Sequence, residues 1–429
     1  GGKLGTGQPI TDLDENFESG LDVLMKTIYC TKTELKSLFY GNETLLDNFE
    51  HIEISHFDDE IKKTKSQKKV LSFEDIKHPI FNPKENSIII FDRRVIERDF
   101  KFLMNELGFS YRDKLYSIWK ERNVKVVFNF AFWEALEYET SLYDFITTDF
   151  PFQHLKLTDY QLFRNKKNFI YDKLYNVFHY FNENLNGKPN SYPVKPHTEE
   201  KQKLFSSMQM KLRPHRLYFL KKLISSGLYK SGYITGTKFF FDEYIGAKER
   251  TDNNSLQNKY YYEKDNWDFF KENWEDYTDI ITDSFENNIW VNHTQKYNLD
   301  LEYDKSFVDI FGETHSIYNT KFPIFTEKAY QPIFFEKMFL LYGGNEFYRV
   351  WKKLGGHNFF EEFGLPNDYD KIESPYTQVD LIVDALSRTN TLKFSKTFSK
   401  SQEKIKENKN IILKHHKKLM DNVLEFISE

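Results

Sequence analysis

Hydrophobic residues in the first half of the chain follow two alternating patterns. Residues 87–91 and 124–128 are short runs rich in apolar, β-branched residues, as in strands that are buried on both faces. Strands that alternate with helices are typical of βαβ units, so residues 25–185 are predicted to form a mainly parallel sheet with its helices. The apolar residues at helical spacing between the two runs are Val95, Phe102, Leu103, Leu107, Leu115 and Ile118.

The same alternation restarts after residue 199. Pro214 stands where the first turn of a helix tolerates proline, and Gly227 is placed to end that helix. A second helix is predicted over residues 345–354, with Gly355 as its C-terminal stop. Three apolar runs predict the strands of this half, at residues 204–210, 307–311 and 338–342.

A stretch that suits neither helix nor strand separates the two halves. Residues 186–196 contain three prolines, a glycine and two asparagines, which predicts an interdomain linker or a long surface loop. Residues 1–24 are interpreted as a leader or a cloning remnant. The predicted organisation is an N-terminal α/β domain (25–185), a linker (186–198), a C-terminal α/β domain (199–390) and a basic amphipathic C-terminal helix (391–429).

An apolar stripe at helical spacing predicts a single helix over residues 401–429. Between Lys393 and Lys418 there are nine lysines and only two glutamates. These lysines predict either the solvated face of a docked helix, which is the commoner arrangement, or a phosphate-binding arm. The residues of the stripe are Ile405, Ile412, Leu419, Val423 and Ile427.

Composition narrows the class of protein. The 429 residues suffice for two or three domains, and an aromatic content of 17% argues against disorder. Lys plus Arg (60) are fewer than Asp plus Glu (65), unlike in a general nucleic-acid-coating protein. We expect a cytoplasmic protein without a membrane span, and the single cysteine excludes an internal disulfide. The 49 lysines, 11 arginines and 5 alanines indicate an AT-rich genome, such as that of a phage, another virus or a low-GC bacterium, and the protein of a phage would act in the host cytoplasm.

Three basic side chains surround the predicted helix start at Pro214, namely Arg213, His215 and Arg216. A helix N-terminus presents unpaired N–H groups and the positive end of the helix dipole, and arginines add bidentate donors. The cluster therefore predicts a pyrophosphate site. An equally weighted structural alternative is that the arginines pair with nearby carboxylates while His215 caps the helix locally.

Two further clusters lie near predicted element ends. Glu313 follows the predicted strand at 307–311, at the carboxyl end where parallel sheets bind ligands, and a glutamate there can orient a sugar or act as a general base. Thr326 is a good N-cap, and Glu327 and Lys328 follow it in positions that can hold a ribose and a phosphate. By spacing alone, a solvated carboxylate and an ordinary helix start are the commoner interpretations.

The sequence lacks the motifs of several other chemistries. It has no Gly-rich phosphate loop, no H-E-x-x-H or paired-cysteine zinc motif and no G-x-S-x-G elbow, so no metal and no bound cofactor are predicted. Asp58, Asp59 and Glu60 are interpreted as surface residues beside a lysine-rich run. The scattered histidines, His56 among them, are interpreted as structural or solvated.

Four motifs occur in a recognisable order. They are R-x-H-R at residues 213–216, Glu313-Thr314, F-T-E-K-A-Y-Q-P-I at residues 325–333 and Tyr342-Gly343. In this order they resemble a family of viral, phage and bacterial glycosyltransferases that are distant relatives of the alpha-fucosyltransferases. The resemblance covers roughly residues 204–386, and it departs from the family after residue 333, where the chain is bulkier and more charged.

The resemblance implies two Rossmann-like α/β domains that face each other across a nucleotide-sugar cleft (the GT-B type), with the acceptor on the N-terminal side and no required metal. Glu313 is the implied catalytic residue. The implied donor-binding residues are Arg213, His215, Arg216, Thr326, Glu327 and Lys328, with the arginines facing the diphosphate, Glu327 the ribose and Lys328 a phosphate.

The implied activity is transfer of a sugar from a nucleotide-sugar substrate to an acceptor hydroxyl. For a phage protein, hydroxymethylated DNA bases are one acceptor, with the lysine-rich segments 62–69 and 393–418 on the phosphates. A glycan, a lipid-linked sugar or a protein is at least as well supported. The alternative from another class is a non-catalytic binding subunit of a viral assembly, which keeps the fold and binds nucleic acid or protein.

Overall fold

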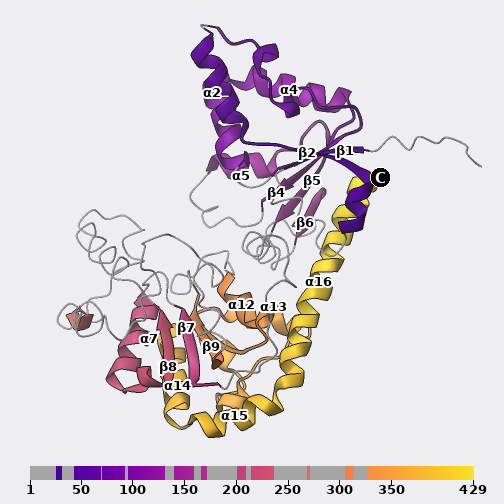
Figure 1. Ribbon diagram of the computed structural model, residues 1–429. Coiled ribbons are helices and arrows are strands. Elements are labelled where there is room, and N and C mark those ends of the chain that lie inside the picture. Colours follow the sequence, from indigo (N-terminus) through magenta and orange to yellow (C-terminus); the bar gives the residue numbers. More distant parts are fainter. Residues whose placement is uncertain are drawn as a thin grey trace, which may run out of the picture.

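The computed structural model of the chain contains two parallel β-sheets and a long C-terminal helix (Figure 1). The structure describes residues 26–30, 43–68, 70–91, 95–130, 140–158, 166–171, 201–208, 214–235, 268–270, 305–313 and 327–429. The predicted leader (1–24) and linker (186–198) lie outside these residues.

The first sheet has six parallel strands in the order β2-β1-β3-β4-β5-β6. The chain leaves β1 to one side to form β2, and then returns past β1 to form β3 on its other side. The carboxyl end of β1 therefore lies at the point where the strand order reverses, which is where open parallel sheets bind ligands. The strands are β1 Lys26–Cys30, β2 Phe49–Glu53, β3 Ile88–Phe91, β4 Lys125–Asn129, β5 Gln153–Thr158 and β6 Phe169–Tyr171.

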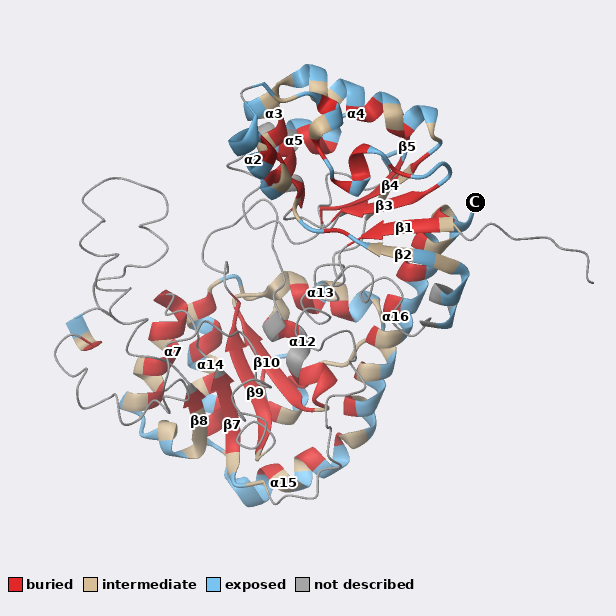
Figure 2. Cartoon of the chain, turned by 45° about the horizontal axis from the view of Figure 1, so that its top comes forward, coloured by how far each residue is buried: buried red, intermediate tan, exposed pale blue. Residues whose placement is uncertain are grey.

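Aromatic packing joins the helices to one face of this sheet (Figure 2). Phe57 of α2 and Trp119 of α4 are fully buried, and both belong to the apolar cluster that contains Phe91 of β3 and Phe128 of β4. Gly108 adopts φ 83° and separates α3 from α4. The helices are α2 Phe57–Gln67, a π-helix Val95–Phe100, α3 Lys101–Leu107, α4 Phe109–Glu121 and α5 Thr140–Thr147, with 3₁₀ turns at Glu43–Asn48, Phe73–Asp75 and Pro79–Phe81.

The second sheet has four parallel strands in the order β10-β9-β7-β8. Every residue of β9, inside the sheet, and of β10, at one end of the strand order, is buried, as expected for a parallel sheet that is covered on both faces. The strands are β7 Lys203–Met208, β8 Gly232–Thr235, β9 Ser306–Gly312 and β10 Met338–Tyr342. The helices are α7 Pro214–Ser225, α12 Glu327–Phe334, α13 Asn345–Lys353, α14 Pro375–Ser387, α15 Thr391–Lys400 and α16 Gln402–Ser428, with 3₁₀ turns at Leu228–Ser231, Glu361–Phe363 and Tyr369–Lys371.

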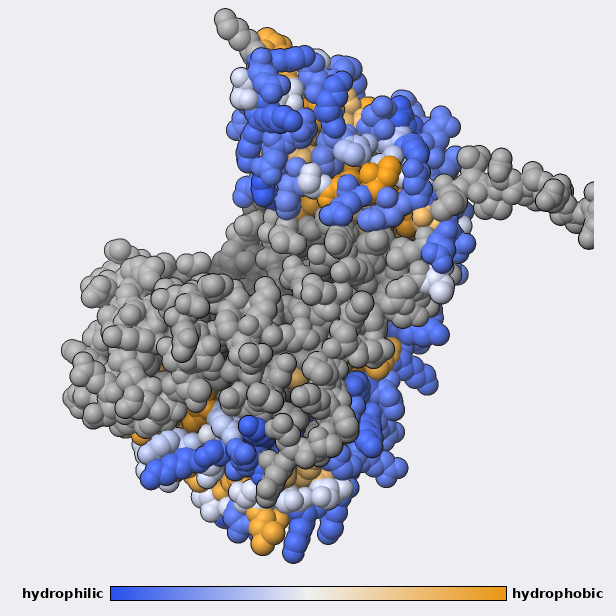
Figure 3. Space-filling view, viewed as in Figure 1, coloured by the Kyte–Doolittle hydropathy of each residue, from blue (hydrophilic) through white to orange (hydrophobic). Residues whose placement is uncertain are grey.

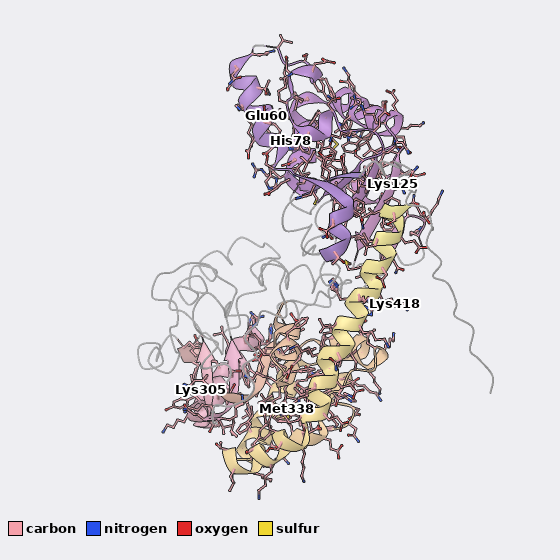
Figure 4. The ribbon with its side chains drawn as sticks, turned by 45° about the vertical axis from the view of Figure 1, so that its right-hand side comes forward. Glu60, His78, Lys125, Lys305, Met338 and Lys418 are labelled. Carbon is pink, nitrogen blue, oxygen red and sulfur yellow. The ribbon has the colours of Figure 1, made fainter. Side chains whose placement is uncertain are left out.

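The helix α16 links the two sheets (Figure 1). Its 27 residues span about 40 Å at 1.5 Å per residue. From the first sheet, Lys26 Nζ donates to the carbonyl oxygens of Ile427 at 3.3 Å and Ser428 at 2.9 Å. Lys125, labelled beside the end of α16 in Figure 4, donates from Nζ to Phe426 O at 2.9 Å. Cationic donors at a helix C-terminus satisfy its free carbonyls and favour its dipole, so these bonds stabilise the link.

The amphipathic stripe predicted for α16 is confirmed. Its members are buried, whereas the outward side of the helix is hydrophilic in Figure 3. Lys404 pairs with Glu362 at 2.7 Å, and Lys409 pairs with Glu336 at 3.1 Å. The α/β class, the parallel pairing and the C-terminal helix are likewise as predicted. Among the described residues, no helix is both long enough and apolar enough to cross a bilayer.

Candidate functional site

The carboxyl edge of the second sheet brings together three of the predicted site residues. β9 ends at Gly312, and α7 begins with Pro214, His215 and Arg216. The buried Arg216 donates to Gly312 O from Nε at 3.0 Å and from one terminal nitrogen at 2.7 Å. His215 Nε2 lies 2.6 Å from Glu313 O and donates to it. The first turn of α7 therefore holds the backbone at the carboxyl end of β9.

Close packing explains why this turn needs glycine. A Cβ on Gly312 would lie 2.5 Å from the ring of Tyr342 and 2.9 Å from the ring of His215. Both rings are buried and lie 5.8 Å apart between centroids. Gly312 therefore lets the end of β9 approach both α7 and β10, which no larger residue permits without displacing an aromatic ring.

Glu313 is buried in the same edge, at 2% exposure. Its backbone N–H donates to Tyr342 O at 3.3 Å, and its Cγ lies 3.1 Å from the position of a Cβ on Gly344. Gly343, which adopts φ 73°, donates its N–H to Gln378 Oε1 at 2.7 Å. The loop that follows β10 is thus fixed beside Glu313 by α14.

Of the four other predicted residues, two lie outside the described residues and two are described by their backbone alone. Arg213 and Thr326 lie outside the described residues, so their roles stay predictions. Glu327 and Lys328 begin α12, as the sequence indicated, while the structure describes only their backbone. The hydrogen bonds of His215 and Arg216 to the carbonyls of Glu313 and Gly312 give both side chains a structural role, and their contact with a phosphate stays a prediction.

The lysine-rich segment at residues 62–69 forms ion pairs. Lys62 lies 2.7 Å from Asp58, and Lys65 lies 2.6 Å from Glu106. Lys68 pairs with Asp75. Because carboxylates compete with phosphate for these side chains, the segment is a weaker DNA-tracking surface than its composition predicted.

A second polar cluster lies at the carboxyl edge of the first sheet. His56 and Asp58 follow β2, and Asp99 lies in the π-helix that follows β3. Ligand-type atoms of these three side chains lie within 4.8 Å of one another, and among the described residues this is the group that could hold a metal ion. Glu60 and His78, labelled in Figure 4, mark this part of the first domain.

The two carboxylates of this cluster have opposite pKa shifts. Burial raises the pKa of Asp99 to about 8, and the neighbouring Asp58 adds to this rise while the Phe57 N–H opposes it. Burial also acts to raise the pKa of Asp58, but hydrogen bonds from Arg98 and Lys62 outweigh it and lower that pKa. Neighbouring carboxyl groups with separated pKa values are typical of sites that move a proton.

Sequence reasoning missed this cluster. Asp58 was interpreted as a surface residue, but its side chain is only 1% exposed, since it lies on the inward side of α2. His56 was interpreted as structural or solvated, and its Nδ1 lies 3.1 Å from Asp99 Oδ1. The available signal was an acidic residue shortly after each of two strands, but β2 is short and polar and was not predicted as a strand.

Three comparisons with known proteins give no identification. No family model, no curated protein and no solved structure matches the chain.

Proposed function

We propose that this chain is a glycosyltransferase that moves a sugar from a nucleotide-sugar donor to an acceptor hydroxyl, with its two α/β domains in a GT-B-type arrangement. The observation that carries the proposal is the carboxyl edge of the second sheet, where the start of α7 and the buried Glu313 meet. Parallel sheets bind ligands at this edge, and the order of the motifs there resembles a glycosyltransferase family.

The N-terminus of α7 suits the donor diphosphate. Its first N–H groups and the positive end of its dipole favour a negatively charged group. They would also stabilise the negative charge that develops on the leaving diphosphate. Arg216 acts here as a positioning residue, because its two bonds to Gly312 O fix the loop that carries Glu313. In this proposal Arg213 and Lys328 contact the phosphates, Glu327 holds the ribose, and Glu313 orients the donor sugar.

A thermal-shift screen against UDP-, GDP-, CMP- and dTDP-sugars tests the proposal. A ligand that binds only the native state adds about 2.7 kcal/mol of stability at a hundredfold excess over its dissociation constant. We expect the melting temperature to rise with the sugars of one nucleotide class. When an acceptor is added, we expect the nucleotide to be released from its sugar. The acceptors to try are hydroxymethylated DNA and oligosaccharides.

Matched variants make the screen specific. Lys328→Ala is expected to abolish the shift, and Glu313→Gln to keep it but reduce nucleotide release. Glu361→Gln serves as the control, because Glu361 is exposed on a 3₁₀ turn in the same domain. A wild-type protein that shifts with none of the nucleotide sugars would overturn the proposal and favour a non-catalytic binding subunit.

A further inference from the structure

The cluster at the first sheet contains an oriented histidine. His56 Nδ1 lies 3.1 Å from Asp99 Oδ1 and 3.2 Å from its Oδ2. Asp99 is fully buried and is itself held by the Phe57 N–H, which donates to Oδ2 at 2.9 Å. The carboxylate therefore has one orientation, and it fixes the plane of the imidazole ring and the nitrogen that faces inward.

The other ring nitrogen faces away from this carboxylate. The side chain of His56 is 27% exposed, whereas that of Asp99 is not exposed at all. Within the described part of the chain, the hydrogen bonds of the ring are those of Nδ1 to Asp99. With a proton on Nδ1, the ring keeps a lone pair on Nε2, in a side chain that is partly open to solvent.

The position of the pair suits a reaction at the first sheet. His56 leaves β2 and Asp99 leaves β3, and these strands flank β1 in the sheet. The hydrogen bond between them thus joins the two segments on either side of the strand-order reversal. Ligands of open parallel sheets bind at such points, so a substrate here would meet the exposed edge of the ring.

The charges favour a proton over a metal ion at this site. Asp58 Oδ2 already accepts hydrogen bonds from Arg98 Nε and Lys62 Nζ, each at 2.7 Å. Arg98 Nε also lies 3.9 Å from Asp99 Oδ1. Even when Asp99 is ionised, two cations therefore balance the two buried carboxylates before any metal binds, and a divalent ion would add two further positive charges beside them.

We propose that His56 accepts the proton of the acceptor hydroxyl, with Asp99 as its positioning residue. This role rests on the proposed glycosyltransferase function. The Nε2 lone pair takes the proton while the acceptor oxygen forms a bond to the anomeric carbon. The bond from that carbon to the diphosphate oxygen breaks, and its electron pair leaves with the nucleotide diphosphate. A single displacement of this kind inverts the configuration at the anomeric carbon.

The groups around the pair give a pH dependence. Asp99 faces His56, Asp58 of α2 and Arg98 of its own π-helix. Outside them, Asp59 pairs with Arg98, and Lys62 with Asp58. His78 packs its ring 5.8 Å from the ring of Phe57 and donates from Nε2 to Ser55 O, and burial lowers its pKa.

The rate of nucleotide release should rise with pH up to about 8, as Asp99 loses its proton and the pair becomes a base.

The first test compares two histidine variants in the full-length chain. His56→Gln is expected to lower the rate of nucleotide release at least about 100-fold while the thermal shift with the donor is unchanged. His357→Gln is the control, because His357 also pairs with a carboxylate, Glu407 at 2.7 Å, and is 32% exposed. A His56→Gln rate within threefold of wild type, with water or hydroxymethylated DNA as the acceptor, would overturn the proposal.

Imidazole rescue separates chemistry from structure. His56→Ala is expected to regain activity with added imidazole, in proportion to the unprotonated imidazole, whereas a merely structural histidine would show no such dependence. Loss of wild-type activity on chelation, restored by Mn²⁺ or Zn²⁺ but only while His56 is present, would instead assign the cluster to a metal and overturn the proton role.

A measurement on the ring itself is independent of the donor. In a histidine ¹⁵N NMR spectrum, the signal that His56→Gln removes is expected to report a ring with its proton on Nδ1 at pH 9. A ring protonated on Nε2 would overturn the dyad, even if nucleotide sugars bind. If the ring behaves as expected and no nucleotide sugar binds, the glycosyltransferase proposal fails, and with it the acceptor role of His56.

Discussion

The carboxyl edges of the two sheets use their polar side chains in different ways. In the second sheet, Arg216 and His215 donate to the carbonyls of Gly312 and Glu313, so they hold backbone in place. In the first sheet, the side chains of His56 and Asp99 contact each other, with Nδ1 3.1 Å from Oδ1. Side chains bonded to carbonyls build the shape of a site, whereas a paired imidazole and carboxyl group can move a proton, and the proposed transfer reaction would use both.

The largest expected effect is at Asp99 and depends on pH. Its folded pKa of about 8 lies above its ordinary value of 3.8, so folding takes up a proton between these values. The stability due to that proton is complete below pH 3.8 and is lost as pH rises through 8. Asp99→Asn keeps an acceptor for the Phe57 N–H, and at pH 9 it should therefore unfold at a higher urea concentration than wild type. The difference in free energy of unfolding between the two proteins should narrow by up to about 1.4 kcal/mol per pH unit as the pH is lowered towards 4. A gap that does not change with pH would show that Asp99 is ionised throughout.

Arg216→Ala should have the next largest effect. It removes two hydrogen bonds from a buried carbonyl and leaves space where a 1%-exposed guanidinium was. We expect a loss of about 3 kcal/mol in the free energy of unfolding, measured by urea denaturation. Arg388→Ala is the control, since Arg388 is 60% exposed and should change stability by less than about 0.5 kcal/mol. Equal losses of unfolding free energy at both positions would show that the buried hydrogen bonds of Arg216 do not stabilise the fold.

Gly312→Ala tests the close approach of β9 to its neighbours. The added methyl meets the buried rings of Tyr342 and His215, so the expected loss is about 2 kcal/mol by thermal or urea unfolding. Gly355→Ala is a useful contrast, because Gly355 adopts φ 85° with no atom within 4 Å of an added Cβ, and its cost is backbone strain alone. A Gly312→Ala protein as stable as wild type would mean that the edge is not closely packed.

Lys62→Met should have the smallest effect. The lysine side chain is 51% exposed, and Arg98 still neutralises Asp58 when it is lost. We expect a change of under about 0.5 kcal/mol in stability and little change in the rate of nucleotide release. A tenfold fall in that rate would show that the charge balance of the first sheet depends on Lys62 as well as on Arg98.

Much of the fold was predictable because its signals are local. The apolar runs at β3, β4, β9 and β10 and the glycine and proline at the ends of α7 each specify an element without reference to the rest of the chain. The strand order was not predictable, because it depends on which runs pair. The π-helix Val95–Phe100 was not predictable either, since its apolar spacing matches an ordinary helix.

The candidate sites divide in the same way. Glu313 was found because it directly follows a strong strand. The pair of His56 and Asp99 was not found, because its members are 43 residues apart and meet only through the pairing of β2 and β3 with β1. In Asp58-Asp59-Glu60, only the first residue is buried, and the sequence does not state which side of α2 faces the sheet.

The hydrogen bonds from Lys26 and Lys125 to the end of α16 can form only late in the synthesis of the chain. Ile427 is synthesised 401 residues after Lys26, the residue that caps it. At about 5–20 residues per second, a ribosome needs roughly 20–80 s to cover that distance. After β6 has been synthesised the first sheet is complete, but the apolar face that contains Ile28, Ile88 and Ile90 still lacks the end of α16. A nascent chain stalled before α16 should therefore bind chaperones that recognise exposed apolar sheets, and release them once α16 has emerged.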